Sequence, residues 1–131
     1  MKYLIDTHTF LWFTNGSFEI SKTAKSIIEN RDNEIFISIA SLWEISIKSA
    51  LGKLYINGSF ESVLEDVIIN NIEIISINFN HLIIQNNLPF HHKDPFDRII
   101  ISQAINDNCN IIGCDEAFDK YLTNQSIKRI W

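Results

Sequence analysis

The sequence predicts an α/β protein, a three-layer α/β/α sandwich with a mainly parallel central sheet. One observation behind this prediction is that short, β-branched apolar runs alternate along the chain with segments whose apolar residues recur at helical spacing. Another is that helices separate the strands, which requires crossover connections and favours parallel pairing. No repeat, low-complexity tract or linker divides the chain, so we expect a single domain over residues 1–131.

Five runs are predicted as strands because they are brief and almost continuously apolar, as is typical of strands buried on both faces. They cover residues 3–5, 35–39, 72–77, 110–113 and 126–130. Four segments between them are predicted as helices because apolar residues recur every three or four positions. These helices cover residues 20–29, 42–51, 60–69 and 79–86.

The stretch HHKDPFDRIIISQA, residues 91–104, predicts a further helix. Asp94 is suited to cap this helix, because its carboxylate can accept backbone N–H groups, and Pro95 suits the first helical position. The Ile-Ile-Ile run has strand propensity. The capping residues and an apolar period of about 3.6 residues from Phe96 to Ala104 nevertheless favour a helix.

The composition excludes several classes of protein. The chain is 46% hydrophobic with only two prolines and four glycines, which argues against disorder. No apolar stretch reaches the roughly 20 residues of a membrane helix, and Asp6 and His8 interrupt the apolar N-terminal segment, which argues against a signal peptide. With only two cysteines, the sequence predicts a cytoplasmic protein without a membrane partner. A net charge of −5 argues against a generic basic surface for nucleic acids, but it is compatible with acids that hold metal ions.

Four acidic residues lie where ligands gather in open parallel sheets, at strand ends and helix starts. They are Asp6, Glu44, Asp97 and Asp115. If the strands are neighbours, these carboxylates converge on one edge of the sheet, where they repel one another unless a cation compensates. Nearby basic residues are too few to neutralise all four. Carboxylate oxygens suit Mg²⁺ or Mn²⁺, and such sites commonly serve phosphodiester hydrolysis.

Two of these acids also have a purely structural interpretation. Ser41-Leu-Trp-Glu44 fits a capping box, with Ser41 as the cap and Glu44 three residues on, and Asp94-Pro-Phe-Asp97 fits the same pattern. Such placements stabilise a helix by about 0.3–2 kcal/mol. Taken singly, capping accounts for Glu44 and Asp97, whereas the conjunction of four acids favours a metal site.

Four sequence blocks occur in an order that resembles a known family. They are DTHTFLW at the start, SIASLWEISIK in the middle, LPFHHKDPFDRIIISQA and the late CDEAFDKY, and together they span nearly the whole chain. The chain resembles the PIN-domain family, and more closely its VapC-like toxin ribonucleases. The resemblance implies a Mg²⁺- or Mn²⁺-dependent endoribonuclease that hydrolyses RNA with a metal-activated water. It also implies a cognate antitoxin partner and a homodimer.

The resemblance assigns the catalytic and metal-binding acids to Asp6, Glu44, Asp97 and Asp115. Asp119 falls where some family members carry another acid, so it is a further candidate metal ligand. Two positions depart from the family pattern. Gly113 stands where many members have Thr or Ser, and His8 stands where Asn or Ser is frequent. Both departures concern groups around the metal ligands rather than the ligands themselves.

Four residues near the acids are candidate substrate contacts: Thr7, Lys48, His92 and Arg98. Each has an alternative. Thr7 can equally be a turn hydroxyl, and Lys48 lies four residues after Glu44, which favours an ion pair along a helix. Arg98, next to Asp97, is similarly ambiguous. His92 and its neighbour His91 are interpreted as loop residues near the substrate path rather than as metal ligands.

Other functions are less compatible with the sequence. A phosphatase of the haloacid-dehalogenase type needs a second Asp two residues after the first, where His8 stands, and a receiver domain needs an Asp at the end of the third strand. The remaining alternative is a catalytically inactive PIN-like module that binds RNA or protein. Four retained acids disfavour it, because an inactive domain has no physical need for clustered carboxylates.

Overall fold

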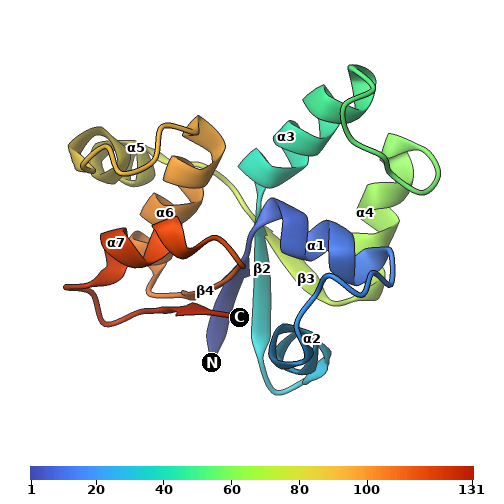
Figure 1. The fold of residues 1–131 in the computed structure, drawn as a ribbon, viewed down its shortest axis with the longest axis horizontal. Coiled ribbons are helices and arrows are strands. Elements are labelled where there is room, and N and C mark those ends of the chain that lie inside the picture. Colours follow the sequence, from blue (N-terminus) through green and yellow to red (C-terminus); the bar gives the residue numbers. More distant parts are fainter.

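Five parallel strands form one sheet at the centre of the structure, a computed structural model of residues 1–131 (Figure 1). The strands are β1 (Lys2–Ile5), β2 (Glu34–Ser38), β3 (Ile72–Ile75), β4 (Asn110–Ile112) and β5 (Arg129–Ile130). Their order in the sheet is β3-β2-β1-β4-β5, and every neighbouring pair is parallel. The predicted parallel sheet is therefore confirmed. Strands β1 and β2 each begin one residue earlier than the predicted runs, and β3, β4 and β5 are shorter than predicted.

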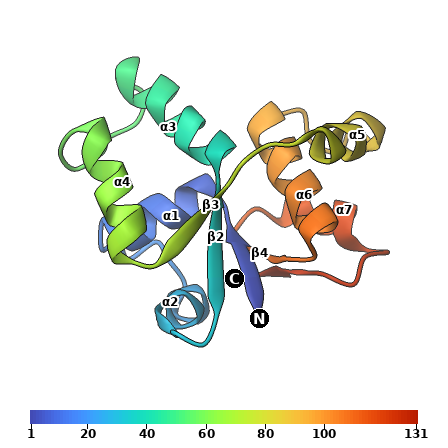
Figure 2. The same cartoon turned by 180° about the vertical axis from the view of Figure 1, so that it is seen from behind.

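Seven α-helices and one short 3₁₀ helix connect the strands. The α-helices are α1 (Thr7–Thr14), α2 (Lys22–Glu29), α3 (Ile39–Ala50), α4 (Phe60–Ile69), α5 (Phe79–Asn87), α6 (Pro95–Asp107) and α7 (Asp119–Leu122), and the 3₁₀ helix is η1 (Glu116–Phe118). Both views of the ribbon show α1 to α4 on one side of the sheet and α5 to α7 on the other (Figures 1 and 2). None of the helices is both long and apolar enough to cross a membrane.

Two hydrophobic cores hold the three layers together, because successive side chains of a strand point to opposite faces. Tyr3 and Ile5 of β1 join the core beneath α1, α2, α3 and α4, whereas Leu4 joins the core beneath α6, η1 and α7. Ile112 and Ile111 of β4 divide between the cores in the same way. The predicted α/β/α sandwich is therefore confirmed.

The predicted helix at 42–51 begins three residues earlier than expected. Ser38, the last residue of β2, caps α3 by accepting a hydrogen bond from the Ala40 N–H at 3.0 Å. Ser41 therefore lies inside the helix, and its buried hydroxyl has no hydrogen-bond partner. The capping box predicted for Ser41 and Glu44 is wrong, because the chain turns from strand to helix without an intervening loop.

Two short helical segments, α1 and η1–α7, were not predicted. Each begins directly after an Asp that caps it. Asp6, which follows β1, accepts the Thr9 N–H at 2.8 Å, and Asp115, in the turn after β4, accepts the Ala117 N–H at 2.9 Å. An Asp directly before a helix is a capping signal. At these positions the signal coincided with acids that already had a functional interpretation.

The strand order places β1 between β2 and β4, at the point where the chain changes direction across the sheet. From β1 the chain moves outward to β2 and β3, and then returns to β4 and β5 on the other side of β1. In open parallel sheets, the carboxyl ends of the strands at such a point form a crevice that binds ligands. The fold therefore brings the segments after β1, β2 and β4 to one edge.

Arg98 fixes the segment between α5 and α6 that borders this edge. Its side chain is buried and its guanidinium donates hydrogen bonds to four backbone carbonyls, with distances between 2.8 and 3.3 Å. These carbonyls belong to Gln85, Leu88, Pro89 and His92. The guanidinium also stacks on the Phe90 ring at 4.2 Å. A single charged side chain thus provides hydrogen-bond donors for four backbone carbonyls at the end of α5 and in the loop after it.

Arg98→Lys is expected to lower the free energy of unfolding by about 2–4 kcal/mol, because one ammonium cannot serve four carbonyls in the geometry of the guanidinium. Urea unfolding of the metal-free protein measures this loss. Arg31→Lys, at an exposed position, is the matched control and should change stability by less than about 0.5 kcal/mol. Equal stability of the two variants would contradict this role of Arg98.

Candidate active site

Asp6 lies at the centre of the carboxyl edge, directly after β1, and its side chain is buried. Its Oδ1 accepts the Thr9 N–H, so the carboxylate caps α1. No basic residue forms an ion pair with it. Burial raises the pKa of Asp6, and the neighbouring charge of Asp115 raises it further. This carboxylate is therefore held without a protein cation to balance it.

Gly113, which follows β4, lies against the second oxygen of Asp6. A Cβ at this position would be 2.5 Å from Asp6 Oδ2 and 3.0 Å from its Cγ, which is closer than nonbonded atoms approach. The Asp6 carboxylate therefore lies in the space that a side chain at residue 113 would occupy. A Thr or Ser at residue 113, as the family pattern has it, would clash with the Asp6 carboxylate in its present position.

Glu44, in the second turn of α3, is buried and fully paired. Its Oε1 accepts the hydroxyl of Thr7 at 2.7 Å, and its Oε2 accepts Lys48 Nζ at 2.6 Å. The predicted ion pair between Glu44 and Lys48 is confirmed. Lys48 remains partly exposed, and the Glu44 carboxylate raises its pKa, as do the charges of Asp94 and Asp97.

Asp97 lies in the first turn of α6, and Asp94 caps this helix as predicted. Asp94 Oδ1 accepts the N–H groups of Phe96 and Asp97, and Pro95 occupies the first turn. The Asp97 carboxylate does not complete a capping box, because it turns toward His92 instead. Burial and the charges of the Asp94, Asp6 and Glu44 carboxylates raise the pKa of Asp97 to about 7. Asp6 and Glu44 thus lie close enough to Asp97 for their charges to act on it.

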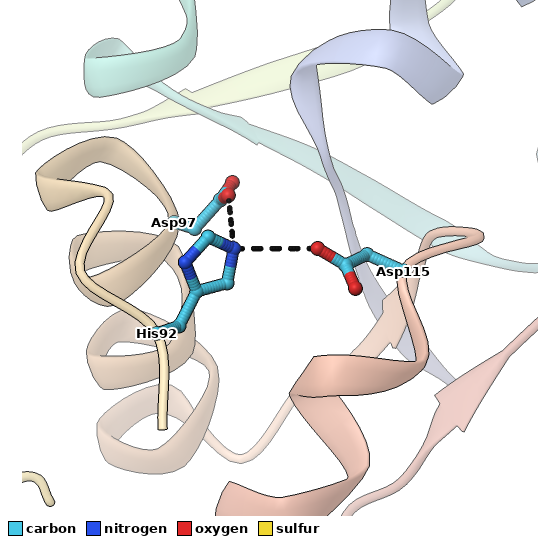
Figure 3. Close-up of side chains that lie close together, drawn as sticks. All are labelled: His92, Asp97 and Asp115. Carbon is cyan, nitrogen blue, oxygen red and sulfur yellow. Dashed lines mark ion pairs between the residues drawn. The ribbon is translucent and has the colours of Figure 1, made fainter. Parts of the chain in front are cut away.

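His92 joins Asp97 to Asp115, the acid after β4 (Figure 3). Its Nε2 lies 2.9 Å from Asp97 Oδ2 and 3.3 Å from Asp115 Oδ2. The sequence named His92 only as a substrate contact, and its link to two acids was missed. The spacing of His92 two residues before the capping Asp94 was the available signal, since this spacing lets the ring reach the start of α6.

Two candidates lie apart from these acids. Asp119 is bound by Arg129, whose Nε and Nη2 donate to its two carboxylate oxygens at 2.9 and 3.0 Å. Arg98 is buried and its donors serve loop carbonyls, so the structure does not present it to a substrate. His8 is exposed and its ring packs beside Trp12. The fold thus brings together four of the predicted acids, Asp6, Glu44, Asp97 and Asp115. Thr7, Lys48 and His92 lie around them.

The donor set of this cluster fits a divalent cation with oxygen ligands. Four carboxylates share an edge where Lys48 is the cation paired with one of them, so negative charge is in excess. Two oxygens, Asp6 Oδ2 and Asp97 Oδ1, accept no hydrogen bond from the protein. Unpaired carboxylate oxygens at a negatively charged edge are the ligands that Mg²⁺ and Mn²⁺ prefer. The residues present are therefore compatible with the metal that the family resemblance implies.

Comparison with protein families agrees with this arrangement. The family model described as PIN domain matches residues 3–122, which include most of β1, the four acids and the helices between them. The chain belongs to the PIN domain family. A search of curated proteins finds no match to this PIN domain.

Solved structures share the fold of this PIN domain at low sequence identity. VapBC2 from Rickettsia felis, bound to a DNA fragment from their promoter, has a TM-score of 0.72 at 18% identity, covering 99% of this chain and 98% of that one. VapBC-1 from nontypeable Haemophilus influenzae has a TM-score of 0.64 at 15% identity, covering 99% and 97%. A PilT N-terminus domain protein from Sulfolobus solfataricus has a TM-score of 0.61 at 13% identity, covering 99% and 86%.

Asp97→Asn is expected to stabilise the metal-free PIN domain by about 1–2 kcal/mol at pH 8. A carboxyl whose pKa rises from 3.8 to about 7 on folding opposes folding once it ionises, fully above pH 7 and not below about pH 4. The gain should therefore shrink at pH 5, where the folded protein already holds the proton. Urea unfolding in EDTA at the two pH values measures both effects.

Asp119→Asn is the matched control for this stability test, because Arg129 already pairs with the Asp119 carboxylate. The control should be unchanged or slightly less stable. A loss of stability in Asp97→Asn at pH 8, or a gain equal to that of Asp119→Asn, would contradict the repulsion inferred at Asp97.

Gly113→Ala is expected to displace the Asp6 carboxylate and lower the free energy of unfolding by about 1–2 kcal/mol, since the cap at Thr9 is strained or lost. A smaller stabilisation by millimolar Mn²⁺ should accompany this loss. Thermal unfolding with and without Mn²⁺ measures both. The control is a double-mutant cycle with Asp6→Ala, in which the added methyl group has no carboxylate to displace. Additive effects in that cycle would show that Gly113 does not make room for Asp6.

Proposed function

We propose that this PIN domain is a metal-dependent endoribonuclease that hydrolyses RNA phosphodiester bonds, and that it is the toxin of a toxin–antitoxin pair. The observation that carries the proposal is the excess of carboxylates at the carboxyl edge of β1, where Asp6 and Asp97 have raised pKa values and free oxygens. A bound cation would offset the repulsion among these carboxylates, which is the physical reason for gathering them at one edge. Family membership and the likeness to VapBC structures support the same assignment.

Asp6, Glu44, Asp97 and Asp115 are the proposed ligands for Mg²⁺ or Mn²⁺. When bound, the cation would polarise the phosphate and lower the pKa of a water that attacks the phosphorus in line. Asp6 and Asp97 form the core of this set, because each offers an oxygen that no protein group occupies. Asp119 is a less direct candidate, since it must leave Arg129 to contribute.

The residues around the acids have distinct roles in this proposal. Thr7 orients Glu44 through the hydrogen bond from its hydroxyl, so it acts on the ligand set rather than on the substrate. Lys48 pairs with Glu44 but remains partly exposed at the rim, where its ammonium can meet an RNA phosphate. Both oxygens of Glu44 are thereby fixed in direction before any ligand binds.

The proposal includes protein partners as well as RNA. One helical face of α3, continued by its C-cap Leu51, and one face of α4 expose apolar side chains at a spacing of four residues: Ile39, Trp43, Ile47 and Leu51, then Phe60, Leu64 and Ile68. A separate exposed group lies on α5, with Phe79, Leu82 and Ile83. Apolar side chains gathered in this way are typical of protein interfaces. They support a cognate antitoxin and a second copy of the chain as partners, and the cytoplasm as the place of action stays a prediction.

Asp6→Asn and Asp97→Asn are each expected to reduce cleavage of a structured RNA in Mn²⁺ by at least about 100-fold, because each removes a charged ligand. Gel analysis of RNA fragments over time measures the rate, with EDTA as a second way to abolish it. Asp32→Asn, an exposed acid in the turn before β2, is the matched control and should cleave like the parent. A variant at Asp6 or Asp97 that cleaves as well as the parent would refute the site. RNA binding without cleavage by the parent would favour the inactive binding module.

A further inference from the structure

His92 occupies the space between two acids that come from different parts of the chain. The ring lies between Asp97 on α6 and Asp115 after β4, with its Nε2 within hydrogen-bond distance of both carboxylates (Figure 3). Its side chain is mostly buried, with 22% exposed. The two acids are 18 positions apart in sequence, and His92 is the residue that joins them.

The backbone of His92 is held from two sides. The Tyr121 hydroxyl accepts the His92 N–H at 2.6 Å and donates to the His92 carbonyl at 3.2 Å. Arg98 donates to the same carbonyl at 3.3 Å, and the Phe118 ring lies beside the imidazole, 6.3 Å between ring centres. Because Tyr121 and Phe118 belong to the buried core, the histidine is anchored to the fold rather than carried on a free loop.

The other ring nitrogen decides which role the Nε2 atom can take. The Asp94 N–H points at His92 Nδ1 at 3.3 Å, so Nδ1 offers a lone pair and the ring proton of the neutral imidazole lies on Nε2. An Nε2–H group donates hydrogen bonds to carboxylates. It has no lone pair for a metal ion, although His92, Asp97 and Asp115 place their ligand atoms within 4.8 Å of one another.

We propose that His92 is a positioning residue whose Nε2–H faces the carboxylates of Asp97 and Asp115, at 2.9 and 3.3 Å, and holds them in the direction needed to bind the cation. This role rests on the proposed metal-dependent site. If His92 Nε2 bound a metal ion, the ring proton would have to lie on Nδ1. The Nδ1–H group and the Asp94 N–H would then point at each other, which is unfavourable. The same Asp94 caps α6 through its side chain, so one residue fixes both the helix start and the state of the ring.

The proton position is tested by nuclear magnetic resonance of the full-length protein labelled with ¹⁵N-histidine. The chain has four histidines, and the signals that disappear in His92→Gln identify those of His92. We expect the proton on Nε2 in the metal-free protein and still on Nε2 at saturating Mg²⁺. A proton on Nδ1 in either state overturns the proposal, because Nε2 could then act as a metal ligand. The proton position is read from the parent protein, and the His92→Gln variant serves only to assign the His92 signals.

The positioning role is tested by Mn²⁺ affinity, measured from the electron paramagnetic resonance signal of free Mn²⁺. His92→Ala should weaken binding about tenfold, as is typical when a group that orients metal ligands is removed. His92→Gln should stay within about threefold of the parent, because its side-chain amide can donate from a similar place. His91→Ala is the matched control and should bind like the parent, since its ring is exposed and packs on Tyr121. Binding by His92→Ala as tight as the parent overturns the proposal, and so does a His92→Gln variant as weak as His92→Ala.

These readouts separate the role of His92 from the proposed function, because neither uses RNA. A protein that binds Mn²⁺ with the expected effects but cleaves no RNA contradicts the nuclease proposal and leaves the role of His92 in place. A protein that cleaves RNA in Mn²⁺, and whose His92→Ala variant binds Mn²⁺ like the parent, contradicts the role of His92 alone. A parent protein that binds no Mn²⁺ contradicts both proposals.

Discussion

Electrostatic repulsion among carboxylates at one edge of the sheet is the constraint that organises this structure. Hydrogen bonds fix oxygens of three acids: the Thr9 N–H for Asp6, Thr7 and Lys48 for Glu44, and the Ala117 N–H for Asp115. The fourth acid, Asp97, faces His92 Nε2 at 2.9 Å. These donors come from the helix starts and side chains immediately around the strand ends. They restrain the acids without neutralising them, since Lys48 pairs with Glu44 alone and the pKa of Asp97 stays near 7. The residual charge is what makes the edge suitable for a cation.

The scaffold meets this constraint by burying a second charged group away from the edge. Arg98 follows Asp97 directly in the sequence, yet its guanidinium points into the α5–α6 segment and binds four carbonyls there. It therefore stabilises the segment that carries His92 instead of neutralising the neighbouring carboxylate. Adjacent residues on a helix point about 100° apart, so opposite charges in consecutive positions need not pair. The basic residue that a charge count would place in the site belongs to its support.

The sequence predicted the layers of the fold because buried strands and amphipathic helices leave different apolar periods, as in the helix at Phe60–Ile69, which is confirmed at both ends. It located the four acids at strand ends and helix starts and made their convergence conditional on neighbouring strands, because the strand order that places β1 between β2 and β4 is not readable from the sequence. The start of α3 was misplaced because Ser38 and Ser41 are both acceptable caps, and only the tertiary path of β2 selects the first. The link through His92 depends on a tautomer and on Tyr121, 29 residues away, which no local pattern contains.

Asp94 illustrates why helix capping and chemistry need not be alternatives in such a site. Its side chain caps α6 and thereby sets the direction of the first turn, from which Asp97 extends over the strand ends. Its backbone N–H, which a capping box would have given to Asp97, goes to the His92 ring instead. The Asp97 carboxylate is consequently free to face the other acids, with one oxygen toward His92 and one without a protein donor. In a capping box, the Asp97 carboxylate would accept the Asp94 N–H and would turn away from the other acids. Because Asp94 caps the helix without this second hydrogen bond, the Asp97 carboxylate remains available to a cation.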